Sequence, residues 1–454
     1  MNSISAPMKA MAGFIAGAKS RSLPPRVAAK ARQHLLDSIA AMVSGAVLHP
    51  GELAIAYATQ QGGRREACVP GSRLVTSAVN AAMAGGMCAH ADETDDSHQP
   101  AFFHPGCAIV PAAWAMGERA HASGRDLLRS VVLGYDVGAR VSLALGAMAF
   151  HQRGHSSHTF GALFGAAAAA GTLAGLSAGQ CRWLLSYTAQ QASGVSCWMR
   201  DPHHVEKAFV LGGMTARNAV YAATMVEAGM TGVDDVFAGT PNLFSAYAPQ
   251  ASLAGLAAGL GETHEIMRAN IKKWSVGSPV QAALDSIDAL MREHGLAAED
   301  VLKIEVQVRD DEADIVNNRD APNICLQHLI ALMLVDRGLS FETSHDASRM
   351  KEPRIRRLRK LIHFEGSRAL REAGGRQALV VVTTRTGRLH HHTRAVRGAA
   401  DNPMTDQEVG AKCLALMSPV LGARRARALA GAIQDIEKVA DIAALRPLLR
   451  ARNR

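Results

Sequence analysis

The chain has 454 residues, a length at which more than one domain is expected. Of these residues 48% are hydrophobic and 20% charged, a composition typical of globular proteins. Its formal charge of +9 permits an acidic partner. The absence of zinc-finger spacing, an RNP-like strand and a recognisable helix-turn-helix argues against nucleic acid, and a small anionic substrate explains the charge with fewer assumptions.

The cysteines and apolar runs indicate the compartment. The seven cysteines are scattered and never form a CxxC pair, so neither a disulfide framework nor a zinc or iron–sulfur site is expected. The longest apolar run, GALFGAAAAAGTLAGL, is mostly Gly and Ala, so no membrane span is expected. The N-terminal stretch AMAGFIAGA lacks a convincing cleavage site and predicts an amphipathic first helix. We expect a cytoplasmic enzyme without metal or cofactor.

Apolar residues recur at helical spacing through most of the first 267 residues. A helix is predicted over Val27–Val43, because the pattern begins directly after Pro24-Pro25. No alternating strand pattern is found before about residue 267. Further helices are predicted at Thr76–Cys88, Cys107–Ala122, Asp126–Leu145, Thr159–Leu176, Ala178–Ala192, Ala208–Ala228 and His264–Ala269.

The character changes after residue 267, where β-branched runs and a hairpin signal at Thr386-Gly387 appear. The predicted strands are Val301–Val316, Ala378–Thr384 and Arg388–Val396, and the predicted helices are Leu326–Asp336, Arg354–Leu361, Gln407–Leu416 and Ala423–Asp441. The expected fold class is therefore mainly α. Residues 1–267 and 400–454 form a large all-helical domain, and residues 268–399 form an inserted smaller α+β lid domain.

A polar loop, HADETDDSHQPAFFHPG, occupies residues 90–106 between two apolar helices. Its four carboxylates and three histidines are costly to bury unless they pair or take part in chemistry. Acids and histidines this closely interleaved can hold an imidazole in one tautomer, as general acid/base catalysis requires. The alternative is a solvated acidic loop with structural histidines. We take the loop as the first candidate for an active-site wall.

Two other polar clusters precede helices. The segment RGHSSHTFG at 153–161 opens a Gly/Ala-rich helix, whose N-terminus suits a carboxylate ligand, although Ser157 or Thr159 could simply cap that helix. Lys207 lies at the N-terminus of another helix, where a cation is unfavourable. We expect it to have a counter-anion, either a substrate carboxylate or Glu206.

Two clusters in the second half have simpler alternatives. Lys272 and Lys273 beside Trp274 would suit an anion clamp at the domain junction, although a solvated linker is the commoner use of such sequence. The run His390-His391-His392 is interpreted as a surface strand and not as a metal site, because successive side chains in a strand face opposite ways.

Together these features resemble the MmgE/PrpD family, which includes 2-methylcitrate dehydratase and cis-aconitate decarboxylase. The resemblance covers nearly the whole chain and rests on Leu23-Pro24, Leu35-Leu36-Asp37, the acidic loop ending His104-Pro105, the segment 155–170, Lys207 with Gly212–Asn218, Lys272 before Trp274, and Asn402-Pro403-Met404-Thr405. It implies a helical domain built from both ends of the chain, a smaller α+β lid, a homodimer, and a reaction without metal.

The resemblance also implies the site residues. The family's loop reads H-x-L-D-F-D-D-T, and here Glu93 replaces its first Asp and Ser97 its Thr. The implied catalytic residues are His104, His155, Lys207 and Lys272. The implied substrate-binding residues are those of the loop, Glu93, Asp95, Asp96 and Ser97, and no metal ligand is implied. Lys273 is added as the second lysine of the candidate anion clamp, and the second-tier candidates for substrate binding are His158, His203 and His328.

The reactions of the family labilise a bond next to a carboxylate. The lysines would bind and polarise substrate carboxylates, while the histidines exchange protons with the carbon skeleton. The resemblance favours a dehydratase of a small citrate-like hydroxy polycarboxylate. Gly277 and His328 stand where the decarboxylase has histidine and tyrosine, which keeps an epimerase, isomerase or decarboxylase of an iminodisuccinate- or cis-aconitate-like acid open. A non-catalytic anion-binding protein is a further alternative.

Overall fold

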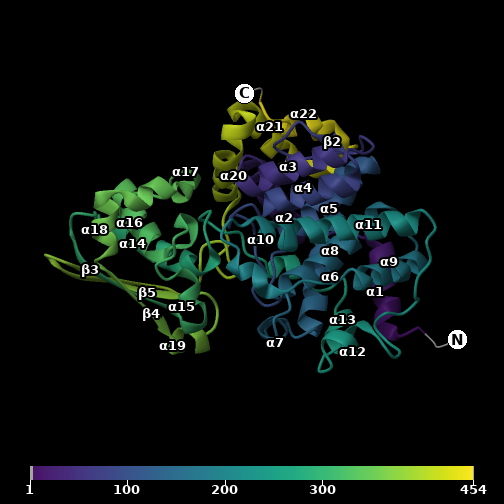
Figure 1. Cartoon of the computed structure of the whole chain (residues 1–454), viewed down its shortest axis with the longest axis horizontal. Coiled ribbons are helices and arrows are strands. Elements are labelled where there is room, and N and C mark those ends of the chain that lie inside the picture. Colours follow the sequence, from purple (N-terminus) through teal and green to yellow (C-terminus); the bar gives the residue numbers. More distant parts are fainter. Residues whose placement is uncertain (1–3, 453–454) are drawn as a thin grey trace. The chain divides into compact units, whose positions relative to one another are not determined.

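The computed structural model describes residues 4–452 and divides into two compact units (Figure 1). The first unit comprises Met1–Asn270 and Asp406–Arg454, and the second unit comprises Ile271–Thr405. The predicted boundaries, 267/268 and 399/400, lie within a few residues of these positions. The predicted fold class, mainly α with a smaller α+β part, is confirmed.

The first unit is helical. Its longer helices are α1 (Ala6–Ala16), α2 (Pro25–Gly45), α3 (His49–Gln61), α4 (Ala78–Ala89), α5 (Gly106–Arg119), α6 (Gly124–Ala144), α8 (Ser157–Leu173), α9 (Ala178–Gln190), α11 (Met214–Glu227), α20 (Asp406–Leu421) and α21 (Ala423–Gln434). Its shorter helices are α7 (Ala147–Gln152), α10 (Val205–Ala208), α12 (Leu243–Tyr247), α13 (Ala254–Ala257) and α22 (Arg446–Leu449).

Helix α8 lies at the centre of the first unit, and every one of its residues is buried. It packs against α5, α6 and α11 (Figure 1). Small residues allow these helices to approach closely, since a Cβ added at Gly165 would lie 2.4 Å from the Gly134 carbonyl oxygen of α6. The abundance of Gly and Ala is thus explained by backbone-to-backbone packing.

The first unit differs from the sequence prediction in several places, among them an unpredicted helix, α3. Residues 264–269 form a short 3₁₀ helix, Glu265–Arg268, and not an α-helix. Two strands, β1 (Ala67–Cys68) and β2 (Val75–Thr76), pair antiparallel where no strand was predicted, because two residues are too few to show alternation. Helix α21 ends at Gln434, earlier than the predicted Asp441.

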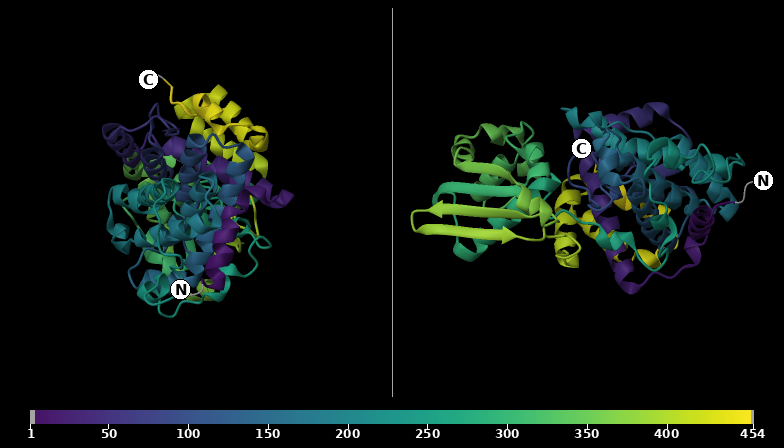
Figure 2. Two further views of the ribbon diagram at one scale, coloured as in Figure 1. Left: turned by 90° about the vertical axis from the view of Figure 1, so that its right-hand side faces the viewer. Right: turned by 90° about the horizontal axis from the view of Figure 1, so that it is seen from below.

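The second unit contains a four-stranded sheet of order β4-β3-β5-β6. Its strands are β3 (Val301–Arg309), β4 (Ile362–Ser367), β5 (Ala378–Thr384) and β6 (Gly387–Thr393), and only β3 and β4 run parallel. Its helices are α14 (Gln281–His294), α15 (Asp310–Val316), α16 (Leu326–Asp336), α17 (Phe341–His345), α18 (Pro353–Arg359) and α19 (Arg368–Glu372). Helix α14 packs on β5 and β6, and α16 packs on α14. Figure 2 shows helices of this unit behind one face of the sheet.

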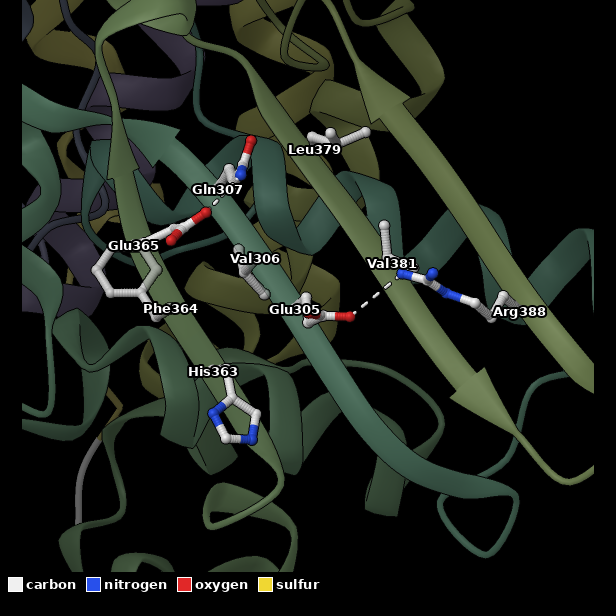
Figure 3. Close-up of a pocket in the computed structure, with 9 residues that line it drawn as sticks. All are labelled: Glu305, Val306, Gln307, His363, Phe364, Glu365, Leu379, Val381 and Arg388. Atoms are coloured by element: carbon white, nitrogen blue, oxygen red, sulfur yellow. Dashed lines mark hydrogen bonds and ion pairs between the residues drawn. The ribbon is translucent and has the colours of Figure 1, made fainter.

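The opposite face of this sheet is open and carries a shallow hollow of about 270 Å³ lined by Glu305, His363, Phe364 and Arg388 among others (Figure 3). The hairpin predicted at Thr386-Gly387 is confirmed by the β5–β6 pairing, which includes His390 to His392. Nε2 of His392 donates a hydrogen bond to Oε1 of Gln377 at 2.9 Å. The strand interpretation of these histidines is therefore confirmed.

Two strand predictions need correction. The run predicted as one strand to Val316 ends at Arg309, because Asp310, Asp311 and Glu312 begin α15, where acidic side chains interact favourably with the positive helix N-terminus. Strand β4 was not predicted, since its sequence, IHFEGS, contains one β-branched residue and a glycine.

Within the described residues, no single helix has both the length and the apolar composition needed to cross a membrane. Only α2 and α3 meet that test as a pair, and they are bent by 83° relative to one another.

Candidate active site

The acidic loop between α4 and α5 is buried. Every residue from Ala91 to His98 is buried, and the side chains of Asp95 and Asp96 are 0% exposed. The solvated-loop alternative is therefore excluded for this segment. Burial of adjacent carboxylates requires partners for both of them, and each of the two has its own set.

Asp95 connects two imidazoles. Its Oδ2 accepts a hydrogen bond from Nδ1 of His90 at 2.9 Å and lies 3.3 Å from Nδ1 of His104. The same His104 Nδ1 lies 2.6 Å from the Asp96 carbonyl oxygen, which can only accept. In the neutral form of His104 the proton is therefore on Nδ1 and the lone pair is on Nε2. The side chain of His104 is 12% exposed, so part of it is open to solvent.

Asp96 joins three helices of the scaffold. Its Oδ2 accepts from Nδ1 of His34 in α2 at 2.6 Å and from the Tyr135 hydroxyl in α6 at 2.5 Å. Its Oδ1 accepts from the Gly106 N–H, at the start of α5, at 2.8 Å. Burial alone would raise the pKa of Asp96, but the hydrogen bonds from His34 and Tyr135 lower it. Asp96 thus remains ionised and fixes the backbone that holds His104.

Four imidazoles form a chain of ring contacts, which we call the histidine cluster: His90, His104, His158 and His204. Ring centroids are 5.1 Å apart for His90 and His104, 5.2 Å for His90 and His204, and 5.3 Å for the stacked His104 and His158. Burial, then the nearby Lys207 ammonium, lowers the pKa of His204 to about 3. Burial, then the charge of His104, holds the pKa of His158 well below its usual value, so both rings are neutral near pH 7.

Lys207 is the cation beside this cluster. Its Nζ is paired with the Glu93 carboxylate and lies 5.5 Å from the centroid of the Trp198 ring. Glu93 also lies 3.9 Å from Nδ1 of His204. A counter-anion for Lys207 was predicted, and the acid that fills this role is Glu93 and not Glu206.

The backbone around Lys207 is unusual. Helix α10 continues into a π-helical turn, Phe209–Gly213, before α11 begins, and such turns are frequent at functional sites. Gly212 in this turn meets Gly86 of α4 backbone to backbone, since a Cβ at Gly212 would lie 2.1 Å from the Gly86 carbonyl oxygen. This contact holds the segment carrying Lys207 against the helix that leads into His90.

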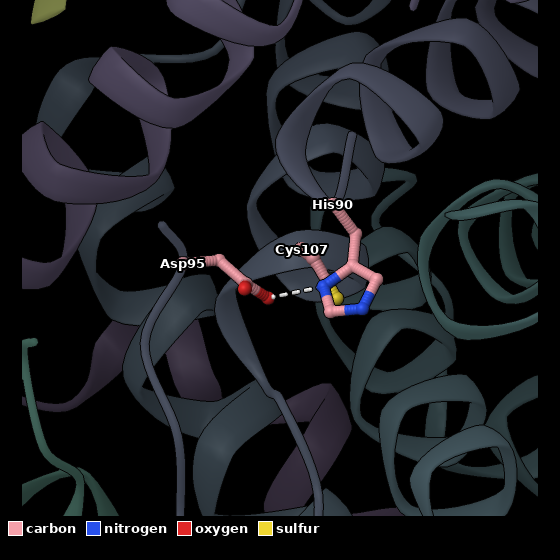
Figure 4. A group of neighbouring side chains, drawn as sticks. All are labelled: His90, Asp95 and Cys107. Carbon is pink, nitrogen blue, oxygen red and sulfur yellow. Dashed lines mark hydrogen bonds and ion pairs between the residues drawn. The ribbon is translucent and has the colours of Figure 1, made fainter. Parts of the chain in front are cut away.

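One group of described residues, His90, Asp95 and Cys107, has the ligand types and spacing that could hold a metal ion (Figure 4). Their candidate ligand atoms all lie within 4.8 Å of one another, and all three residues are buried. Thiolate, imidazole and carboxylate are the ligands that Zn²⁺ accepts. His90 and Asp95 also satisfy each other by a hydrogen bond, and the Cys107 thiol donates to the His104 carbonyl oxygen at 3.3 Å. The expectation of a reaction without metal stays a prediction.

Some predicted site residues of the first unit lie outside the histidine cluster. His155 stacks on Phe150 with ring centroids 4.5 Å apart and meets Tyr247 edge-on at 5.9 Å. His203 is exposed, whereas the adjacent His204 is in the cluster. Ser97 exchanges backbone hydrogen bonds with Asn270, which closes the loop.

The remaining predicted residues belong to the second unit. Lys272 is buried, and Lys273 pairs with Asp288 at 2.9 Å while lying over the Trp274 ring. His328 is buried in α16, where burial lowers its pKa to about 4. The roles predicted for these three residues stay predictions.

Sequence reasoning missed several partners of the site. His34 and Tyr135 sit in helices with no local chemical signal. Lys412 in α20 donates to Asp37 at 2.6 Å and to the Thr94 carbonyl oxygen at 3.2 Å, which attaches the acidic loop to the C-terminal part of the unit. Only tertiary structure brings this lysine to the loop.

The His34–Asp96 pair predicts acid sensitivity. Burial lowers the pKa of His34 from 6.5 to about 4, so the unfolded chain takes up a proton before the folded chain does as the pH falls. Stability from this group is complete above about pH 6.5 and is lost between there and pH 4, with about 2.5 kcal/mol lost at pH 4.5. Urea unfolding at several pH values should show this decline. His34→Asn, which keeps a donor for Asp96, should flatten it; an unchanged pH dependence in the variant would contradict the assignment.

Comparisons with known proteins agree with this architecture. The model of the MmgE/PrpD N-terminal domain matches residues 9–255, and that of the MmgE/PrpD C-terminal domain matches residues 274–438. The chain therefore belongs to the MmgE/PrpD family, as its sequence features predicted. It is similar to the cis-aconitate decarboxylase-like protein oryM of Aspergillus oryzae, with 28% identity over 237 residues, or 50% of this chain and 48% of that protein. The match spans about half the length of that relative.

Proposed function

We propose that this protein is a lyase that dehydrates a small citrate-like hydroxy polycarboxylate by removing a proton next to a carboxylate. The observation that supports this most is the fixed tautomer of His104, whose Nδ1 is held by Asp95 and the Asp96 carbonyl oxygen. An imidazole held in this way presents the Nε2 lone pair to a substrate, which is the arrangement a general base needs.

The proposed reaction requires one base and one cation. His104 Nε2 takes the proton from the carbon next to a substrate carboxylate, and negative charge develops on that carboxylate. Lys207, held by Glu93 and Trp198, stabilises this charge in a site partly shielded from water. The imidazolium of His104 then gives its proton to the hydroxyl group on the neighbouring carbon. Water leaves, a carbon–carbon double bond remains, and His104 returns to its neutral form.

The surrounding imidazoles support this role for His104. His158 stacks on its ring, and both His158 and His204 have depressed pKa values. With these two neighbouring rings neutral, His104 is the ring of this pair of contacts that takes up the proton, and Lys207 is the cation beside it. Lys272 is proposed as a second substrate-binding cation, on the family resemblance alone.

A panel of di- and tricarboxylates, followed by proton NMR in D₂O, tests the proposal. We expect a hydroxy polycarboxylate to form an alkene with its vinyl proton signal and ultraviolet absorbance. Deuterium entering recovered substrate without alkene would instead identify an epimerase. Release of CO₂ would identify a decarboxylase, the activity that the name of the relative from Aspergillus oryzae suggests. Tight binding of tricarboxylates with no turnover would contradict an enzyme of any of these kinds.

A further inference from the structure

A second hollow lies in the first unit, between the β1–β2 ladder and the C-terminal helices α21 and α22. Its volume is about 420 Å³, within the range of small-molecule sites. It shares no residue with the histidine cluster. Five arginines line it: Arg65, Arg73, Arg425, Arg446 and Arg450.

The charge of this hollow is largely uncompensated. Arg446 donates to the Glu118 carboxylate at 2.8 Å, and Glu118 is fully buried and also accepts from the Cys68 N–H at 2.7 Å. Among residues 4–452, no carboxylate lies within 4.0 Å of a guanidinium nitrogen of the other four arginines, and no Asp or Glu lines the hollow. Four positive charges thus remain around one depression.

The position of these arginines bears on where the excess positive charge of the chain lies. The excess of +9 was attributed to attraction of a carboxylate substrate. The histidine cluster has Lys207 as its neighbouring cation, already paired with Glu93, and no arginine takes part in its ring contacts or hydrogen bonds. Four arginines without a carboxylate partner among the described residues therefore lie around the second hollow, where the proposed reaction does not use them.

We propose that this hollow binds a small polyphosphate anion, with adjacent phosphate groups held by the arginine side chains. Guanidinium groups match phosphate oxygens in bidentate geometry, and several of them around one hollow favour a ligand with more than one phosphate. Val69, Leu74, Val75 and Leu449 also line the hollow and offer apolar contact to an organic group. The shared chemistry, adjacent phosphates, could come from a nucleoside triphosphate or from inorganic polyphosphate.

Arg446 is already bound to Glu118 and to the Glu66 carbonyl oxygen, so it positions the wall of the hollow. Arg425 donates to the Arg450 carbonyl oxygen at 2.5 Å, which ties α21 to the end of α22. Arg65, Arg73 and Arg450 are exposed at the edge of the hollow. A wall fixed by Arg446 and Arg425, with exposed arginines at its edge, is suited to an anion that arrives from solvent.

The test measures binding to the full chain by calorimetry at about 0.15 M salt, with tripolyphosphate, ATP and adenosine as probes. We expect both phosphates to bind and adenosine not to bind. Tighter binding of ATP than of tripolyphosphate would assign the organic ligand, and equal or weaker binding of ATP would assign the inorganic one. The double variant Arg73→Glu/Arg450→Glu should weaken binding at least tenfold.

The matched control is Arg424→Glu/Arg427→Glu, which makes the same charge change at exposed positions of α21 that do not line the hollow. It should leave the dissociation constant within about twofold of the parent value. Equal weakening in both double variants would show a diffuse charge effect and overturn the proposal. Absence of phosphate binding at millimolar concentration would also overturn it. Because binding is measured directly, either result is independent of the proposed lyase activity.

Discussion

Replacing His104 by asparagine is expected to lower kcat/KM for the true substrate by about 10²–10⁴, the usual cost of losing a general base. Asparagine keeps an N–H near the position of Nδ1, which donates toward the Asp96 carbonyl oxygen at 2.6 Å in the parent protein. It lacks the Nε2 lone pair. The variant should therefore fold normally and bind substrate while losing proton transfer, which steady-state kinetics and circular dichroism together would measure.

The same measurement on His155→Asn and His158→Asn tests which of these two histidines supports His104 in the reaction. We expect His158→Asn to have the larger effect, because its ring stacks on His104 whereas that of His155 stacks on Phe150. His121→Asn is the neutral control, since this histidine is 72% exposed and pairs with Asp441 at the surface. A variant at His104 that retained turnover within a few-fold of the parent would disprove the proposed base.

The architecture could be predicted well from the sequence because each long helix has a recognisable pattern of apolar residues within its own segment. Helices α2, α6 and α8 follow from apolar periodicity, and the change to β-branched runs marked the second unit. The acidic loop was recognisable as a candidate site because so many ionisable side chains are costly to bury in an ordinary hydrophobic core. These signals are all contained in short windows of sequence.

The contacts between individual histidine rings could not be predicted from short windows of sequence. His155 precedes α8 and His158 lies within its first turn, so a few residues turn the two side chains toward different neighbours. His204 adopts a left-handed conformation, with φ 60°, and enters the cluster while His203 remains exposed. Such choices depend on backbone geometry and long-range contacts that composition and spacing do not contain.

Gly212→Ala is expected to destabilise the first unit by about 1–3 kcal/mol, the typical cost of overpacking. The added Cβ would lie 2.1 Å from the Gly86 carbonyl oxygen and 2.6 Å from its carbon, and backbone atoms cannot rotate away as a side chain would. Either α4 or the π-helical turn must shift. Because α4 leads into His90 and α10, which carries Lys207, precedes the turn, activity should fall together with stability.

Gly410→Ala is the matched control. Gly410 lies inside α20, where a Cβ would meet nothing within 4 Å, so the same substitution should stabilise the protein by roughly 0.5–1 kcal/mol through helix propensity. Urea unfolding of both variants, followed by tryptophan fluorescence, gives the comparison. If Gly212→Ala were as stable as the parent, the close crossing of Gly86 and Gly212 would not be what holds Lys207 beside the histidine cluster, and the placement of that cation would need another cause.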